Sequence, residues 1–195
     1  MTCNLTKSAL GGSSGATNRE YAIVDTSADD VREAQMIFQA DWDRRQTPTL
    51  ADPNLVVSPT NARPKLEQLL QSARSSLLEE EEMDDTDMED QLIAAARRGV
   101  SVQVILPAAP AGDPGANQDV PRLTQAGVQV RYSQTLYMHA KMIVADGTRA
   151  FVGSENFSAT SLDANRELGI VVADPAAIAK LQETFARDWD NAVAA

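Results

Sequence analysis

Short apolar runs alternate with amphipathic stretches along most of the chain. Apolar runs of about four to eight residues between turn formers are typical of buried strands, and apolar positions three or four apart are typical of helices. Strands that alternate with helices indicate an α/β sandwich. We therefore expect an α/β/α sandwich around a mixed, largely parallel sheet. The pattern predicts strands at 55–58, 76–83, 102–106 and 128–132 and helices at 64–73, 87–98 and 120–125.

An internal repeat relates the two ends of the chain. Asn18-Arg19-Glu20 recurs as Asn165-Arg166-Glu167, and at the same offset Asp41-Trp42 recurs as Asp188-Trp189. Nine of the 25 positions from 18 to 42 are identical without a gap. Repeats of this kind indicate that one structural unit has been copied. Each copy predicts a strand followed by an amphipathic helix, with the strands at 20–25 and 167–172.

The repeat divides the chain into two unequal parts. We interpret residues 1–48 as the C-terminal remnant of a first unit and residues 49–195 as a complete second unit. The boundary lies in the polar stretch 45–53, which contains two prolines. Upstream, residues 2–6 align with residues 154–158 if the first copy contains an insertion of five residues.

A hairpin is predicted around Asp146-Gly147, which separates the apolar runs 142–144 and 150–152. With these two residues as the turn, His139 faces Ser154. A shift by one residue places His139 opposite Asn156 instead. Either register brings four side chains to one end of the hairpin: His139, Lys141, Ser154 and Asn156.

This set of side chains suits the binding and attack of a phosphate group. A lysine neutralises nonbridging oxygens, asparagine and serine donate hydrogen bonds, and a histidine transfers protons or a phosphoryl group. His139 and Lys141 are two positions apart, so a strand would place both on one face.

The composition excludes several classes of site. The chain has one histidine and one cysteine, so it has no zinc site built on several histidines and no disulfide within the chain. A net charge of -11 argues against a protein built to coat nucleic acid. We expect the acidic run at 79–82, with Asp84, Asp85 and Asp87, to be a solvated strand end and helix N-terminus. The polar N-terminus predicts no targeting segment, and no apolar run is long enough to span a membrane.

The spacing His139-x-Lys141-x4-Asp146-x6-Gly153-Ser154-x-Asn156 resembles the HKD motif of the phospholipase D superfamily. The residues at 55–59, 95–100 and 165–167 also look like its bacterial phospholipase and cardiolipin-synthase-like members. The resemblance implies two such motifs at one active site. One histidine would attack phosphorus and form a phosphohistidine, and the other would protonate the leaving alcohol and then activate water or an acceptor alcohol. It implies no metal and no cofactor.

The resemblance also assigns roles to individual residues. His139 would be one of the two histidines, Lys141, Ser154 and Asn156 would bind the phosphate, and Asp146 would organise the site. An acid from each half would orient the histidine of the other, so Glu20 would orient His139 and Glu167 the partner histidine. Asn4 would correspond to Asn156 in the first copy.

The first copy departs from the motif because it has no histidine, lysine or aspartate of its own. Three explanations stay open: a chain that lacks its first half, a homodimer in which two copies of His139 meet, and an inert or binding module. We expect a phosphodiesterase that hydrolyses or transfers phospholipid head groups. The alternatives are a nuclease of the same superfamily acting as a homodimer and a noncatalytic vestige.

Overall fold

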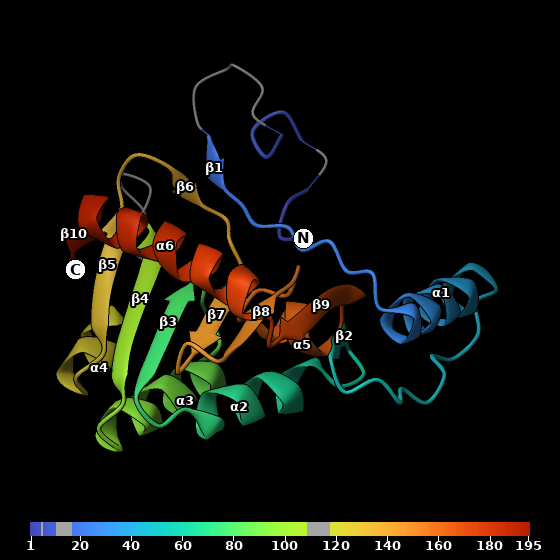
Figure 1. Cartoon of the computed structure of the whole chain (residues 1–195). Helices are drawn as coiled ribbons and strands as arrows, with labels where there is room; N and C mark the ends of the chain where they lie inside the picture. The colour runs from blue at the N-terminus through green and yellow to red at the C-terminus, as the bar shows by residue number, and fades with distance from the viewer. Residues whose placement is uncertain (5, 11–16, 109–117) are drawn as a thin grey trace.

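The computed structural model describes residues 1–4, 6–10, 17–108 and 118–195. Most of them form one eight-stranded sheet with helices on both faces (Figure 1). The strand order is β10-β5-β4-β3-β7-β8-β9-β2. These strands are β2 (Leu55–Ser58), β3 (Ser76–Glu80), β4 (Ser101–Pro107), β5 (Gln129–Ser133), β7 (Met142–Ala145), β8 (Arg149–Val152), β9 (Glu167–Val172) and β10 (Val193–Ala194).

The helices divide between the two faces of the sheet. One face is covered by α2, α3 and α4, and the other by α6, which crosses the sheet in Figure 1. The first of the described helices, α1, lies to the side, beyond β2 (Figure 1). The helices are α1 (Ala28–Trp42), α2 (Ala62–Ser72), α3 (Thr86–Arg97), α4 (Val120–Gln125), α5 (Ala159–Asp163) and α6 (Pro175–Asn191).

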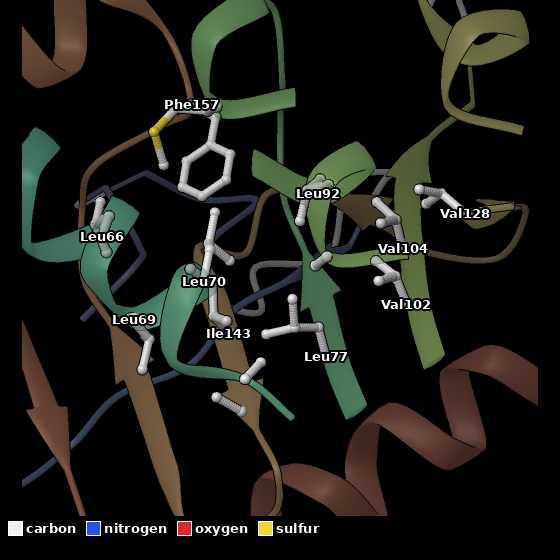
Figure 2. Close-up of a cluster of buried hydrophobic side chains, with 14 of the residues drawn as sticks. Leu66, Leu69, Leu70, Leu77, Leu92, Val102, Val104, Val128, Ile143 and Phe157 are labelled. Carbon is white, nitrogen blue, oxygen red and sulfur yellow. The ribbon is translucent and has the colours of Figure 1, made fainter. Parts of the chain in front are cut away.

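Two hydrophobic clusters hold these layers together. In the first, Leu66 and Leu70 of α2 and Leu92 of α3 pack against Leu77 and Ile143 of the sheet (Figure 2). In the second, apolar residues of α6 pack on the other face of the same strands. Full burial of one such side chain contributes about 1.5–3 kcal/mol. The expected α/β/α layering and the mixed sheet are confirmed.

The parallel part of the sheet is smaller than expected. Only β3–β4 and β4–β5 are parallel, and the remaining neighbours in this sheet are antiparallel. Strands β7 and β8 are joined by a turn at 146–148, which is too short for a parallel crossover of about a dozen residues.

The hairpin adopts neither of the two expected registers. Met142 pairs with Val152 and Ala145 with Arg149, which leaves a three-residue turn at 146–148. Asp146 and Gly147 have φ values of 54° and 65°, and Thr148 N donates to Ala145 O. The extra turn residue places the true register midway between the two alternatives. His139 and Lys141 lie just before β7, outside any strand.

The predicted strand at 20–25 is wrong. Only β1 (Asn18–Arg19) forms, and it pairs in parallel with β6 (Tyr137–Met138) as a separate two-stranded sheet. The equivalent strand β9 forms because β8 and β2 flank it. Residues 20–25 have no such flanking strands, and an extended segment needs them to satisfy its backbone. Leu5 and the extra residues of the first copy lie outside the described residues.

The acidic run is buried, which corrects the expectation of a solvated strand end. Glu79, Glu80 and Glu81 are fully buried because β3 is a central strand covered on both faces. Burial raises the pKa of Glu79 and of Glu80 to about 8, and the nearby Glu89 adds to the shift of Glu79. The expected place at a helix N-terminus is confirmed for Asp85, which caps α3 by accepting from Met88 N, although Asp85 is itself buried.

Within the part of the chain that the structure describes, no helix combines the length and the apolar character needed to cross a membrane.

Candidate active site

A carboxylate from the first copy orients the histidine of the second. The pairing of Asn18 with Tyr137 and of Arg19 with Met138 brings the next residues, Glu20 and His139, side by side. Glu20 Oε1 lies 2.8 Å from His139 Nδ1. A carboxylate on Nδ1 favours the tautomer that carries its proton there and leaves Nε2 free to react. In the described residues, Nε2 has no hydrogen-bond partner.

Glu20 is itself held by two neighbours. Thr2 Oγ1 donates to Glu20 Oε2 at 2.5 Å, and Asn18 Nδ2 donates to Oε1 at 3.1 Å. Thr2 Oγ1 also accepts from Tyr21 N at 2.9 Å, so its hydroxyl links the carboxylate to the backbone. This arrangement fixes the direction of the carboxylate toward the imidazole.

Glu167 occupies the equivalent setting in the second copy. Ser154 Oγ donates to Glu167 Oε2 at 2.5 Å and accepts from Leu168 N at 3.1 Å. Asn165 Nδ2 lies 3.5 Å from Glu167 Oε1. The bonds that fix Glu20 therefore recur around Glu167, position by position. Glu20 faces a histidine, and Glu167 faces none, since the chain has only His139.

The two copies also exchange ion pairs. Arg19 of the first copy binds Asp188 of the second with two hydrogen bonds of 2.5 and 2.6 Å. Arg166 of the second copy binds Asp41 of the first with bonds of 2.8 and 3.0 Å. Both arginines use a bidentate geometry. The reciprocal pairs indicate a local two-fold relation between the copies, with the site beside it.

Lys141 is buried beneath His139, with only 2% of its side chain exposed. Its Nζ donates to His139 O at 2.7 Å and lies 3.7 Å from Glu82 Oε2. Tyr137 OH holds the other oxygen of Glu82 at 2.5 Å. A buried cation needs such a partner, because its desolvation is costly. Burial raises the pKa of the adjacent Glu81 well above its usual value, and the charge of Lys141 opposes that shift.

Asn156 lies at the same end of the hairpin. Its backbone N donates to Ser161 Oγ at 2.9 Å, whereas its buried Oδ1 has no hydrogen-bond partner among the described residues. Asn4 adopts the equivalent turn, since its carbonyl accepts from Thr6 N as that of Asn156 accepts from Ser158 N. The side chain of Asn4 is exposed.

Asp146 lies at the opposite end of β7 from His139 and acts on the backbone. Its carboxylate accepts from the N–H groups of Arg74, Ser75 and Ser76 and from the Ser75 hydroxyl. Partial burial alone would raise the pKa of Asp146, but these bonds outweigh it and lower the pKa to about 2. The residue therefore anchors the hairpin turn to the start of β3.

Sequence reasoning missed Thr2, Tyr137 and Glu82. Thr2 could have been found from the repeat, because it aligns with Ser154. Tyr137 and Glu82 carry no motif, and only the folded chain brings the Tyr137 hydroxyl to Glu82 and Glu82 to Lys141. Within the described ranges, no three His, Cys, Asp or Glu side chains gather in a way that could hold a metal ion.

Comparison with known proteins shows which family the chain belongs to. A family model described as "Cardiolipin synthase, PLD-like domain" matches residues 66–189. A mitochondrial cardiolipin hydrolase of Chlamydomonas reinhardtii is 33% identical over 53% of this chain and 46% of its own length. A cardiolipin synthase of Geobacillus kaustophilus is 27% identical over 83% of this chain and 38% of its own. The chain thus spans less than half the length of either relative.

The fold is shared with solved structures as well. Nuc, a phospholipase D family member from Salmonella typhimurium, superimposes with a TM-score of 0.65 at 22% identity, covering 72% of this chain and 95% of that one. The family match covers more than half of the chain and includes His139, Lys141, Asp146 and Asn156. The chain belongs to the phospholipase D-like family.

Proposed function

We propose that this protein is a phospholipase D-type phosphodiesterase that hydrolyses or transfers phospholipid head groups, with His139 as its nucleophile. The observation that carries the proposal is the contact between Glu20 Oε1 and His139 Nδ1, which leaves Nε2 without a hydrogen-bond partner in the described residues, while the buried Lys141 binds the His139 backbone oxygen. A base oriented by a carboxylate is the usual setting of an activated nucleophile.

In the proposed reaction, the lone pair of His139 Nε2 attacks phosphorus, and the bond from phosphorus to the leaving oxygen breaks. The imidazole becomes a phosphohistidine, and its positive charge is balanced by Glu20. Lys141 and Asn156 hold the nonbridging oxygens, and Ser154 fixes Glu167. The Glu82 carboxylate and the phosphate compete for the Lys141 ammonium group, so the contact between Glu82 and Lys141 must break when phosphate binds.

The leaving alkoxide needs a proton, and a water or an acceptor alcohol must then lose one to attack phosphorus. A second histidine supplies both transfers in this proposal, placed against Glu167 as His139 is placed against Glu20. The chain has one histidine, so the second comes from another phospholipase D-like half. Residues 1–48 are then the tail of that half, as the mirrored bonds of Glu20 and Glu167 support.

Phospholipid is the favoured substrate over nucleic acid. The two relatives compared above by sequence are named mitochondrial cardiolipin hydrolase and cardiolipin synthase. Several arginines that could contact phosphates are instead paired with carboxylates, as Arg63 is with Asp85 and Arg122 with Glu89. Nucleic-acid binding depends on free cations, and the net charge here is -11.

The test uses a phosphodiester whose leaving group needs no proton. With bis(p-nitrophenyl) phosphate, we expect one equivalent of p-nitrophenolate and a phosphoryl adduct on His139, because one histidine suffices for the first step. The untagged chain contains a single histidine, so mass spectrometry assigns the adduct without ambiguity. His139→Ala should form no adduct, and Lys180→Met, at an exposed site, should react like the wild type.

Vesicles of phosphatidylcholine or cardiolipin and supercoiled plasmid then separate the substrate classes, assayed with the protein joined to a second half. Head-group release without plasmid nicking supports the phospholipase. Nicking without head-group release supports the nuclease. The absence of any adduct on His139 would support the hypothesis that the protein is a noncatalytic vestige.

A further inference from the structure

Glu82 places a carboxylate beside the cation that binds phosphate in the proposed reaction. Its Oε2 lies 3.7 Å from Lys141 Nζ, and the Lys141 side chain is only 2% exposed. The Lys141 ammonium also donates to His139 O at 2.7 Å, and Glu20 Oε1 lies 2.8 Å from His139 Nδ1. The ion pairs that the described residues form around His139 thus contain two carboxylates and one lysine. An anion that binds to Lys141 therefore meets negative charge as well.

Tyr137 holds Glu82 in this position. Its hydroxyl donates to Glu82 Oε1 at 2.5 Å, and its ring centroid lies 6.3 Å from that of His139. The hydrogen bond to Glu82, together with partial burial, raises the pKa of Tyr137 to about 12, so the hydroxyl remains a donor at neutral pH. When phosphate binds Lys141, Glu82 can therefore lose its contact with the lysine and still remain beside the site as a negative charge.

The simplest explanation of Glu82 is that it neutralises a buried lysine, which needs a partner because its desolvation is costly. The surroundings of Glu82 contain more negative charge than this role requires. Burial, the carboxylate of Asp85 and the carboxylate of Glu82 together raise the pKa of Asp84, so Asp84 also lies within electrostatic reach of Glu82. The Glu82 side chain is 26% exposed, so its charge faces the side from which a ligand can approach.

The charge of a phosphate ligand depends on how many of its oxygens are esterified. A phosphodiester carries a single negative charge, whereas a phosphomonoester has a second pKa of about 6 and carries about two negative charges well above that pH. Coulomb energy is proportional to each charge, so Glu82 opposes the binding of a dianion with twice the free energy with which it opposes a monoanion. In the dissociation constant, this doubling of the free energy squares the factor by which Glu82 weakens binding.

We propose that Glu82 is a specificity-determining residue that selects phosphodiesters over phosphomonoesters at His139, with Tyr137 holding it in place. The proposal rests on the proposed function and extends it to the release of product. In hydrolysis, a water oxygen bonds to phosphorus, the bond from phosphorus to His139 Nε2 breaks, and the second histidine takes the proton of water. The product is a phosphomonoester, and its second ionisation puts a dianion beside Glu82, which favours release. Transfer to an acceptor alcohol yields another diester, so Glu82 does not favour release in that case.

The test measures binding without turnover. The untagged chain has a single histidine, so the ring protons of His139 give assigned NMR signals that report binding at the site. Dimethyl phosphate, a monoanion, and methyl phosphate, a monoester, are titrated at pH 5 and at pH 8. For Glu82→Gln at pH 8, we expect the affinity for methyl phosphate to rise about three- to tenfold and that for dimethyl phosphate about two- to threefold. At pH 5, where methyl phosphate carries about one charge, the two gains should be equal.

Two further variants serve as controls. Glu183→Gln, at an exposed ion pair with Lys180, should change neither affinity. Tyr137→Phe removes only the hydroxyl that holds Glu82, so it should give a smaller gain with the same dependence on pH. Glu82→Gln leaves the other titratable groups near the site unchanged, so their titration cancels in the ratio of its affinity to that of the wild type. These groups are Glu20, Glu81, Asp84, Tyr137, His139 and Lys141.

Equal gains for the two ligands at pH 8, or a loss of affinity in Glu82→Gln, would overturn the proposal, because Glu82 would then act on Lys141 regardless of the charge of the ligand. His139 signals that neither ligand shifts, in the wild type or in the variant, would also overturn it, since no phosphate would then bind beside Glu82. The adduct on His139 tests the proposed function separately. A charge-dependent gain without an adduct would support selection by Glu82 and contradict the nucleophile, and an adduct with equal gains would do the reverse.

Discussion

The Nδ1 atom of His139 lies 2.8 Å from Glu20 Oε1, although 119 positions separate the two residues in the chain. The contact joins the first copy to the second and leaves Nε2 free to react. In the proposed function, Glu20 is thus a positioning residue for the nucleophile.

Glu20→Gln should slow the labelling of His139 by at least about tenfold. Loss of the orienting carboxylate of a Ser-His-Asp triad costs up to about 10⁴-fold, because the tautomer becomes wrong. The measurement is the rate of p-nitrophenolate release from the single chain. Glu167→Gln is the matched control, since Glu167 has the same hydrogen bonds but no contact with His139. Equal rates of p-nitrophenolate release for the two variants would contradict the proposal that Glu20 orients His139.

Glu82→Gln should tighten the binding of phosphate to the site. Glu82 Oε2 lies 3.7 Å from Lys141 Nζ and competes with an incoming anion for the same charge. Glu82 is partly exposed, so solvent weakens the competition, and we expect about a three- to tenfold gain. The measurement is the inhibition of His139 labelling by vanadate or inorganic phosphate. Glu183→Gln, at an exposed ion pair with Lys180, is the control. Weaker inhibition would mean that Glu82 supports Lys141 instead of competing with phosphate.

Asp146→Asn should lower the free energy of unfolding by about 1–2 kcal/mol at pH 7, because the carboxylate accepts bonds from three backbone N–H groups. The folded pKa of Asp146, about 2, lies below its usual value. Its contribution is therefore complete above the unfolded pKa of about 4 and is lost as the pH falls toward 2. Urea unfolding at pH 7, 4 and 3 should show the two proteins converging. Asp190→Asn, at an exposed position, should match the wild type throughout. A constant difference across these pH values would contradict the prediction.

Glu79→Met should make the protein more stable at pH 9 and change little at pH 4. Burial raises the folded pKa of Glu79 to about 8, so its stabilising protonated form is lost as the pH rises from about 4.5 through 8. Methionine has a similar volume and no charge, so it fits the same space. Urea unfolding from pH 4 to 9 should show a smaller decline in the variant, with a gain above about 1 kcal/mol at pH 9. Parallel curves for the two proteins would mean that Glu79 does not titrate in this range.

Much of the fold could be predicted from local patterns. The helix at 120–125 was predicted with the observed bounds, and α2 and α3 differ from their predicted limits by one or two residues. These elements follow from side-chain periodicity, which is local. The strand at 20–25 failed for the opposite reason: its residues match those of β9, but the neighbouring strands that β9 has are missing there.

The sequence alone determined the α/β class, the internal repeat and the set of residues around His139. Each can be recognised from the order and spacing of residues along the chain, without knowing which residues are in contact. The tertiary structure decided which carboxylate meets His139, that Lys141 and three glutamates are buried, and that Phe38 and Trp42 of α1 are exposed. Those features depend on which strands become neighbours and which faces they cover. Residues far apart in the chain become partners only when the sheet assembles.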